Sequence, residues 1–192
     1  MKFRIFGTEF EISFLFTAML SVMIAFDKTG EIYLFFLAAT IHESAHFLTL
    51  CFFGCRPKAV RLIPGGINIV DNSPKLLFAD ILILISGPFA NLICFFLFKG
   101  NFSLINLLLF VYNILPFDRL DGGSILWLTV GHFFGVKKAD SVIIYTTLVA
   151  AGLLISGFFC LLYMGIPNYS LLIFSLYLFS GVVFKKVVER KS

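Results

Sequence analysis

The sequence predicts an all-α polytopic membrane protein with about six transmembrane helices, and three features of its composition indicate this class. Hydrophobic residues make up 59% of the 192 positions, and Phe alone contributes 26 of them. Charged residues make up only 14%, against roughly 25% in an average soluble domain. Because so few polar side chains cannot cover the surface of a fold this size, a soluble globular protein is excluded. The net charge of +4 is too dispersed for a nucleic-acid-binding surface.

Six apolar runs form the predicted spans, within one domain that comprises residues 1–192. A span needs about 20 apolar residues, and the second, third and fifth runs reach this length. A seventh apolar stretch, residues 124–134, is too short to cross and predicts an interfacial or half-buried helix. The six runs are residues 14–26, 32–53, 81–98, 102–117, 142–164 and 169–184.

The distribution of positive charge predicts the orientation of these spans. With six spans and both termini in the cytoplasm, every one of the 15 Lys and Arg residues except Lys28 and Lys99 lies on the cytoplasmic side. Such an excess of positive charge in cytoplasmic segments is the general rule for multi-pass membrane proteins.

Residues 61–72 differ from the helical runs. Arg61–Val70 mixes β-branched residues with a turn signal at Pro64-Gly65-Gly66. This pattern predicts a short β-hairpin near the membrane surface, between the second and third spans. It is the one strand-like segment that we expect in the chain.

A zinc-binding pattern, H-E-x-x-H, lies inside the second span and comprises His42, Glu43 and His46. Positions i and i+4 share one face of a helix, so both imidazoles can bind one zinc ion, and the adjacent Glu can act as a base. A charge at the centre of a membrane helix costs about 2.5–3.5 kcal/mol, so polar groups at this depth indicate function. The alternative is a buried polar cluster that only joins helices.

Two histidines are too few, because a catalytic zinc usually has three protein ligands. The candidates for the third are Asp118, Asp121 and His132. Asp121 is the best placed, since Pro116 ends the fourth apolar run and Gly122-Gly123 lets the backbone bend next to it. Cys51 and Cys55 also share a helical face, but buried Cys usually acts as a small hydrophobic residue.

Two asparagines lie within or at the end of apolar runs. Asn91 follows Ser86-Gly87-Pro88 in the third span, and Asn113 lies next to the proposed metal loop. Each can make a hydrogen bond between helices or contact a substrate. Gly87-Pro88 predicts a kinked helix and close contact with a neighbour.

These three motifs together resemble the site-2 protease family, whose members are zinc metalloproteases that cut within or next to the membrane. The resemblance covers residues 42–123 and rests on H-E-x-x-H, S-G-P-x-x-N and N-x-x-P-x-x-x-L-D-G-G, in that order. It implies that zinc is bound by two histidines and an aspartate, with a glutamate as catalytic base and three further residues that shape the site. The implied residues are His42, His46 and Asp121 as ligands, Glu43 as base, and Asn91, Asn113 and Pro116 as site-shaping residues.

Within that family the chain resembles the sporulation-type branch, which has six spans and removes the pro-sequence of a sigma factor. The resemblance implies a bacterial cell-membrane protein whose catalytic core is about residues 31–123, with extra spans in residues 141–184. Members commonly carry a cytoplasmic CBS domain after the last span. This sequence ends at Ser192, so we expect either a member without that domain or a truncated chain.

The predicted function is therefore zinc-dependent hydrolysis of peptide bonds in membrane-embedded or membrane-associated protein substrates. The expected partners are such substrates, the lipid bilayer and membrane inhibitor or regulatory proteins, and no nucleic acid. The hairpin edge at Gly66, Ile67, Asn68 and Ile69 is expected to hold the extended substrate as an added strand. The alternatives are a metal or proton transporter, which also places ionisable residues in the membrane, and a non-catalytic scaffold.

Overall fold

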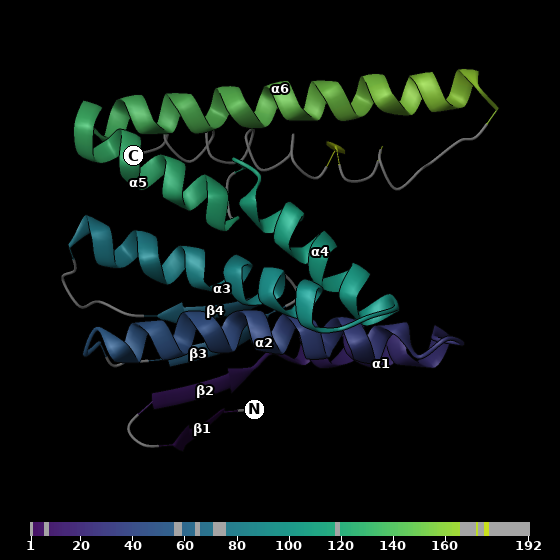
Figure 1. The fold of residues 1–192 in the computed structure, drawn as a ribbon, viewed down its shortest axis with the longest axis horizontal. Helices are drawn as coiled ribbons and strands as arrows, with labels where there is room; N and C mark the ends of the chain where they lie inside the picture. Colours follow the sequence, from purple (N-terminus) through teal and green to yellow (C-terminus); the bar gives the residue numbers. More distant parts are fainter. Residues whose placement is uncertain are drawn as a thin grey trace. The chain divides into compact units, whose positions relative to one another are not determined.

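The computed structural model describes residues 2–5, 8–55, 59–63, 66–70, 76–117, 120–165, 172, 175 and 176. The chain divides into two compact units, Met1–Asn113 and Ile114–Ser192. The elements, coloured along the chain in Figure 1, are β1 (Lys2–Ile5), β2 (Thr8–Ile12), α1 (Phe14–Phe26), α2 (Glu31–Phe52), β3 (Ala59–Ile63), β4 (Gly66–Val70), α3 (Leu77–Leu97), α4 (Asn101–Ile114), α5 (Asp121–Phe134) and α6 (Val136–Tyr163).

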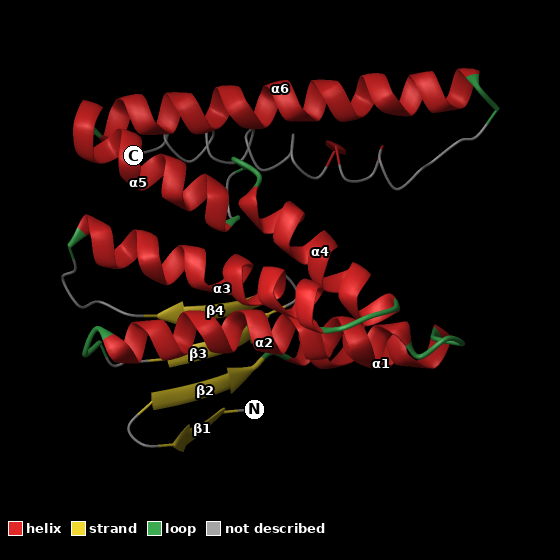
Figure 2. Cartoon of the chain, in the orientation of Figure 1, coloured by secondary structure: helices red, strands yellow, loops and turns green. Residues whose placement is uncertain are grey.

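The first unit contains a four-stranded sheet with the strand order β1-β2-β3-β4, drawn in yellow in Figure 2. β1 pairs with β2 and β3 pairs with β4 in antiparallel fashion, whereas β2 and β3 are parallel. Parallel neighbours need a long crossover connection, which α1 and α2 provide here. The sheet is therefore larger than the predicted hairpin, and the expectation of a single strand-like segment is wrong because β1 and β2 precede the first helix.

Helices α2 and α3 pack against each other and form the helical centre of the first unit. The start of α2 is fixed by Asp27, whose carboxylate accepts hydrogen bonds from the backbone N–H groups of Gly30 at 3.0 Å and Ile32 at 3.2 Å. Gly30 adopts a positive φ of 75°, which a residue without a Cβ tolerates. α3 continues through Pro88.

The second unit is built on α6, against which α5 packs. The indole N–H of Trp127 in α5 donates a 2.9 Å hydrogen bond to Asp140 in α6. Phe117, in the link before α5, is buried with Ala151 of α6. The link is also held by the Thr146 hydroxyl, which donates to the carbonyl oxygen of Pro116 at 2.9 Å.

Three helices of the described residues, α2, α3 and α6, are long and apolar enough to cross a membrane. α1 and α4 are apolar but shorter, and α5 covers the predicted interfacial helix. Apart from residues 172, 175 and 176, the predicted sixth span lies outside the described residues. The chain is thus mostly helical with several candidate membrane helices, and the count of six spans stays a prediction.

Candidate metal centre

The two histidines of the H-E-x-x-H motif lie on the buried face of α2. His42 and His46 are 6% and 8% exposed, and they share this face with Ala38 and Leu50. Their Nε2 atoms are 3.1 Å apart. The i, i+4 spacing therefore brings the two ring nitrogens to one point inside the first unit, as the motif predicts.

The partners of the opposite ring nitrogens determine which tautomer each histidine adopts. His46 Nδ1 lies 2.6 Å from the backbone carbonyl oxygen of Ile83, which can only accept a hydrogen bond. His42 Nδ1 lies 2.6 Å from Asn91 Oδ1, an amide oxygen. Both Nδ1 atoms therefore carry the proton, and both Nε2 atoms present a lone pair.

This donor set fits zinc. Two imidazole nitrogens bound to one tetrahedral zinc at about 2.0–2.1 Å would lie about 3.3–3.4 Å apart, close to the observed 3.1 Å. The second hydrogen bond of each ring fixes its orientation, which is the usual arrangement around a metal-bound histidine. Two lone pairs that face each other are also stabilised by a cation between them.

Gly87 of α3 lies directly against the two ring nitrogens. A Cβ added at this position would lie 2.7 Å from His42 Nε2 and closer still to His46 Nε2. The sequence predicts only close helix contact at this glycine, whereas the structure shows that the contact is with the imidazoles. The missing side chain thus leaves room where an ion would bind.

Gly87→Ala is expected to abolish zinc binding, because the methyl group would occupy the space in front of both Nε2 atoms. The measurement is the zinc content of the purified variant. Gly152→Ala in α6 is the matched control, since a Cβ there meets nothing within 4 Å. Retention of a full zinc complement by Gly87→Ala would contradict this placement of the ion.

Asp121 is the first residue of α5 in the second unit, and its Oδ2 atom is buried. A carboxylate at a helix N-terminus is favoured by the helix dipole. Gly122 and Gly123 are needed behind it, because a Cβ on either would collide with the carbonyl oxygens of Ile114 and Phe117, respectively. The predicted break is confirmed, since α4 ends at Ile114 and α5 begins at Asp121.

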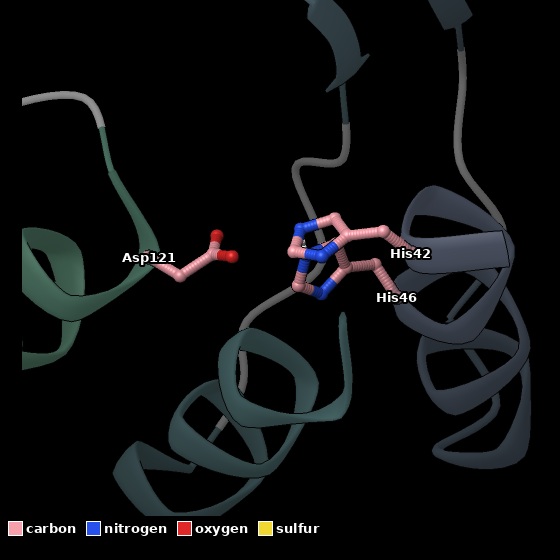
Figure 3. A group of neighbouring side chains, drawn as sticks. All are labelled: His42, His46 and Asp121. Carbon is pink, nitrogen blue, oxygen red and sulfur yellow. Dashed lines mark hydrogen bonds between the residues drawn. The ribbon is translucent and has the colours of Figure 1, made fainter. Parts of the chain in front are cut away.

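His42, His46 and Asp121 are the described residues that could together hold a metal ion, each offering one ligand atom (Figure 3). Figure 3 draws the two imidazoles on α2 and the carboxylate of Asp121 at the start of α5. Two imidazole nitrogens and one carboxylate oxygen make a ligand set that zinc uses in catalytic sites.

The other candidate ligands of the described residues are not in this group. His132 is exposed on α5, and its ring packs against that of Phe133. Cys51 is exposed in the last turn of α2, while Cys55 is buried beyond its end. Asp118 lies outside the described residues.

The remaining predicted site residues lie in α2, α4, the link before α5 and β4. Glu43 is half-buried in α2 next to His42. Asn113 donates from Nδ2 to the carbonyl oxygen of Leu109 in its own helix, at 3.1 Å. Pro116 is exposed in the link that precedes α5. It stays a prediction that these residues contact a substrate. The same holds for the residues of β4, which are Gly66, Ile67, Asn68 and Ile69.

One buried residue near the site is absent from the sequence-based predictions. Asn106 of α4 is 0% exposed and accepts a hydrogen bond from Asn91. The sequence feature that could have identified Asn106 is an amide side chain in the middle of an apolar helix. Its partner lies in another helix, so the sequence alone does not identify the contact.

Comparison with known proteins finds relatives of the chain both in sequence and among solved structures. A zinc metalloprotease from Methanocaldococcus jannaschii is 28% identical over 164 residues, which cover 73% of this chain and 48% of that protein. Stage IV sporulation protein FB from Bacillus subtilis is 28% identical over 127 residues, which cover 58% of this chain and 44% of that protein. No protein-family model matches the chain.

The structure of a site-2 protease from Methanocaldococcus jannaschii matches the fold with a TM-score of 0.67 and 24% sequence identity. The match covers 95% of this chain and 93% of that structure. The chain spans about half the length of the curated sequence relatives that it matches.

Proposed function

We propose that this chain, which its sequence relatives and its fold place in the site-2 protease family, is a zinc-dependent endopeptidase of membrane proteins. The observation that carries the proposal is the pair of buried imidazoles in α2. Each donates a hydrogen bond from Nδ1, and the two Nε2 atoms are directed to a common point. A cluster that only joined helices would not need two facing lone pairs.

The proposed chemistry assigns a separate task to each residue. His42, His46 and Asp121 would hold the zinc ion, which would supply a Lewis acid for polarising the scissile carbonyl and acidifying a water molecule. Glu43 accepts the proton of the attacking water and then donates it to the leaving amine. Its place beside His42 in α2 keeps this base next to the ligands, and the half-buried position limits its contact with bulk water.

The proposal is tested by co-expressing the chain with candidate membrane-tethered substrates and mapping any cut. We expect a cut within or next to the substrate's membrane segment, and its disappearance when zinc is removed with a chelator. Zinc or proton flux across vesicles that contain the purified protein, without any cleavage, would instead indicate a transporter.

Several finer features belong to the same proposal. The substrate is proposed to be a membrane-associated precursor such as a pro-sigma factor, as the resemblance to the sporulation-type branch implies. The name of the relative stage IV sporulation protein FB supports a connection with sporulation. The chain is proposed to cross a bacterial membrane six times with both termini in the cytoplasm, in accordance with the distribution of Lys and Arg. Membrane-bound inhibitors or regulators are proposed as further partners.

The substrate peptide is proposed to bind in extended form along β4. β4 is an end strand of the sheet and pairs with β3 alone in the described part of the chain. An exposed strand edge binds an extended peptide through backbone hydrogen bonds, and peptide hydrolysis requires an unwound substrate. The residues concerned are Gly66, Ile67, Asn68 and Ile69.

Replacement of Ile67 or Ile69 by Pro is expected to abolish cleavage, because Pro removes a backbone N–H donor. Ile67→Ala and Ile69→Ala are the matched controls and should retain part of the activity. Ile67 and Ile69 are two residues apart in β4, so their N–H groups face the same side of the strand and the two Pro variants should behave alike. Full activity of both Pro variants would contradict strand addition, and loss of zinc from either would indicate misfolding.

A further inference from the structure

We infer that Asn106 of α4 is a positioning residue for the metal ligand His42 and that it acts through Asn91. The inference rests on the proposed function, since it concerns the affinity of the same site for zinc. Its basis is a series of buried hydrogen bonds within the first unit, which connects α4 through α3 to α2.

The three side chains that these hydrogen bonds connect are fully or almost fully buried. Asn106 and Asn91 are both 0% exposed, and His42 is 6% exposed. Asn91 Nδ2 lies 2.8 Å from Asn106 Oδ1, and Asn91 Oδ1 lies 2.6 Å from His42 Nδ1. Water cannot readily replace a lost partner at such depth, so each bond affects the next.

Backbone carbonyl groups fix the orientation of both amides. Asn106 Nδ2 lies 2.8 Å from the carbonyl oxygen of Phe102, and Asn91 Nδ2 lies 3.2 Å from that of Ala38. A carbonyl oxygen only accepts hydrogen bonds, so each of these amide nitrogens must be the donor. Asn106 Oδ1 is consequently the acceptor for Asn91 Nδ2, and Asn91 Oδ1 is directed to His42.

This orientation determines whether His42 can bind a metal. If the Asn91 amide rotated by 180°, its NH₂ group would face His42 Nδ1 and favour the tautomer with the proton on Nε2. That tautomer has no lone pair for zinc. Two acceptors, the Ala38 carbonyl and Asn106 Oδ1, hold the amide against this rotation. Removal of Asn106 Oδ1 leaves only one of them.

The decisive variant is Asn106→Leu, which keeps the size of the side chain and removes the acceptor. Asn106→Asp keeps an oxygen acceptor toward Asn91 and, as the buried protonated acid, an O–H donor toward the Phe102 carbonyl, so it serves as the conservative rescue. Ser103→Ala is the matched control, because Ser103 is also buried in α4 and donates one hydrogen bond to α3, to the carbonyl oxygen of Phe95 at 2.8 Å. That bond has no connection to His42 in the described contacts.

The experiment measures the zinc dissociation constant of each purified full-length variant by competition with a chelator, together with the melting temperature without metal. Changes in the outer shell of a metal site typically cost 10–100-fold in affinity. We expect Asn106→Leu to weaken zinc binding about tenfold, with Asn106→Asp and Ser103→Ala within about twofold of the original chain.

Unchanged zinc affinity in Asn106→Leu would overturn the inference. A loss of zinc affinity in Ser103→Ala as large as that in Asn106→Leu would also overturn it. So would an equally large loss in Asn106→Asp, provided that its melting temperature matches that of Asn106→Leu. These results leave the proposed protease function intact, because the original chain still binds zinc. Absence of zinc binding by the original chain would instead refute the proposed function, and the inference with it.

Discussion

Glu43→Gln is expected to retain zinc and to lose peptide cleavage by at least about 10²–10⁴-fold, the usual contribution of a general acid–base group. The amide is nearly the same size as the carboxylate, so the packing of α2 should not change. It cannot accept the proton of the attacking water, and hydrolysis therefore stops. Zinc content and the yield of cut substrate, measured on the same preparation, test the prediction.

Loss of zinc together with activity would show that Glu43 is a ligand or a structural residue. A useful control is Ser44→Ala, one position further along α2, where the side chain is exposed. This variant should retain both zinc and activity. If it behaves like Glu43→Gln, the change in activity reflects disturbance of the helix and not the loss of a base.

Asp121→Asn is expected to weaken zinc binding by more than about 100-fold, since even changes in the outer shell cost 10–100-fold. The neutral amide is a poor zinc ligand, and it removes the negative charge that the carboxylate contributes. The first turn of α5 should form as before, because Asn is also accepted near a helix N-terminus. The measurement is chelator competition with the purified chain.

Asp118→Asn is the matched control for this assignment, with the same chemical change three residues earlier in the sequence. It should leave zinc affinity within about twofold. Loss of zinc from Asp118→Asn and retention by Asp121→Asn would reverse the assignment. If neither variant has an effect and His132→Ala does, the site contains three histidines.

The sequence predicts the features of this protein that depend on local chemistry. The second apolar run, residues 32–53, corresponds closely to α2 (Glu31–Phe52) because hydropathy and helix length are properties of a continuous segment. The break between α4 and α5 is equally local, since it depends on Pro116 and on the glycine pair after Asp121.

The features that the sequence does not predict depend on contacts between distant segments. The alternation of polar and apolar residues in β2 is visible in the sequence, but its partner β3 lies about 50 residues further along and is reached only through α1 and α2. Gly87 is recognisable as a point of close contact, yet only the packing of α3 on α2 shows that it faces the imidazoles. Asn106 contacts Asn91 from another helix, so its role too emerges only from the fold.

The central claim is that His42, His46 and Asp121 bind one zinc ion, and zinc X-ray absorption of the purified full-length chain tests it most directly. We predict a first shell of nitrogen and oxygen only, at about 2.0–2.1 Å, with the outer-shell scattering of two imidazoles. The spectrum of His46→Ala should lose half of the imidazole signal or all of the zinc. A sulfur shell at about 2.3 Å would show that cysteines bind the metal and would contradict the claim.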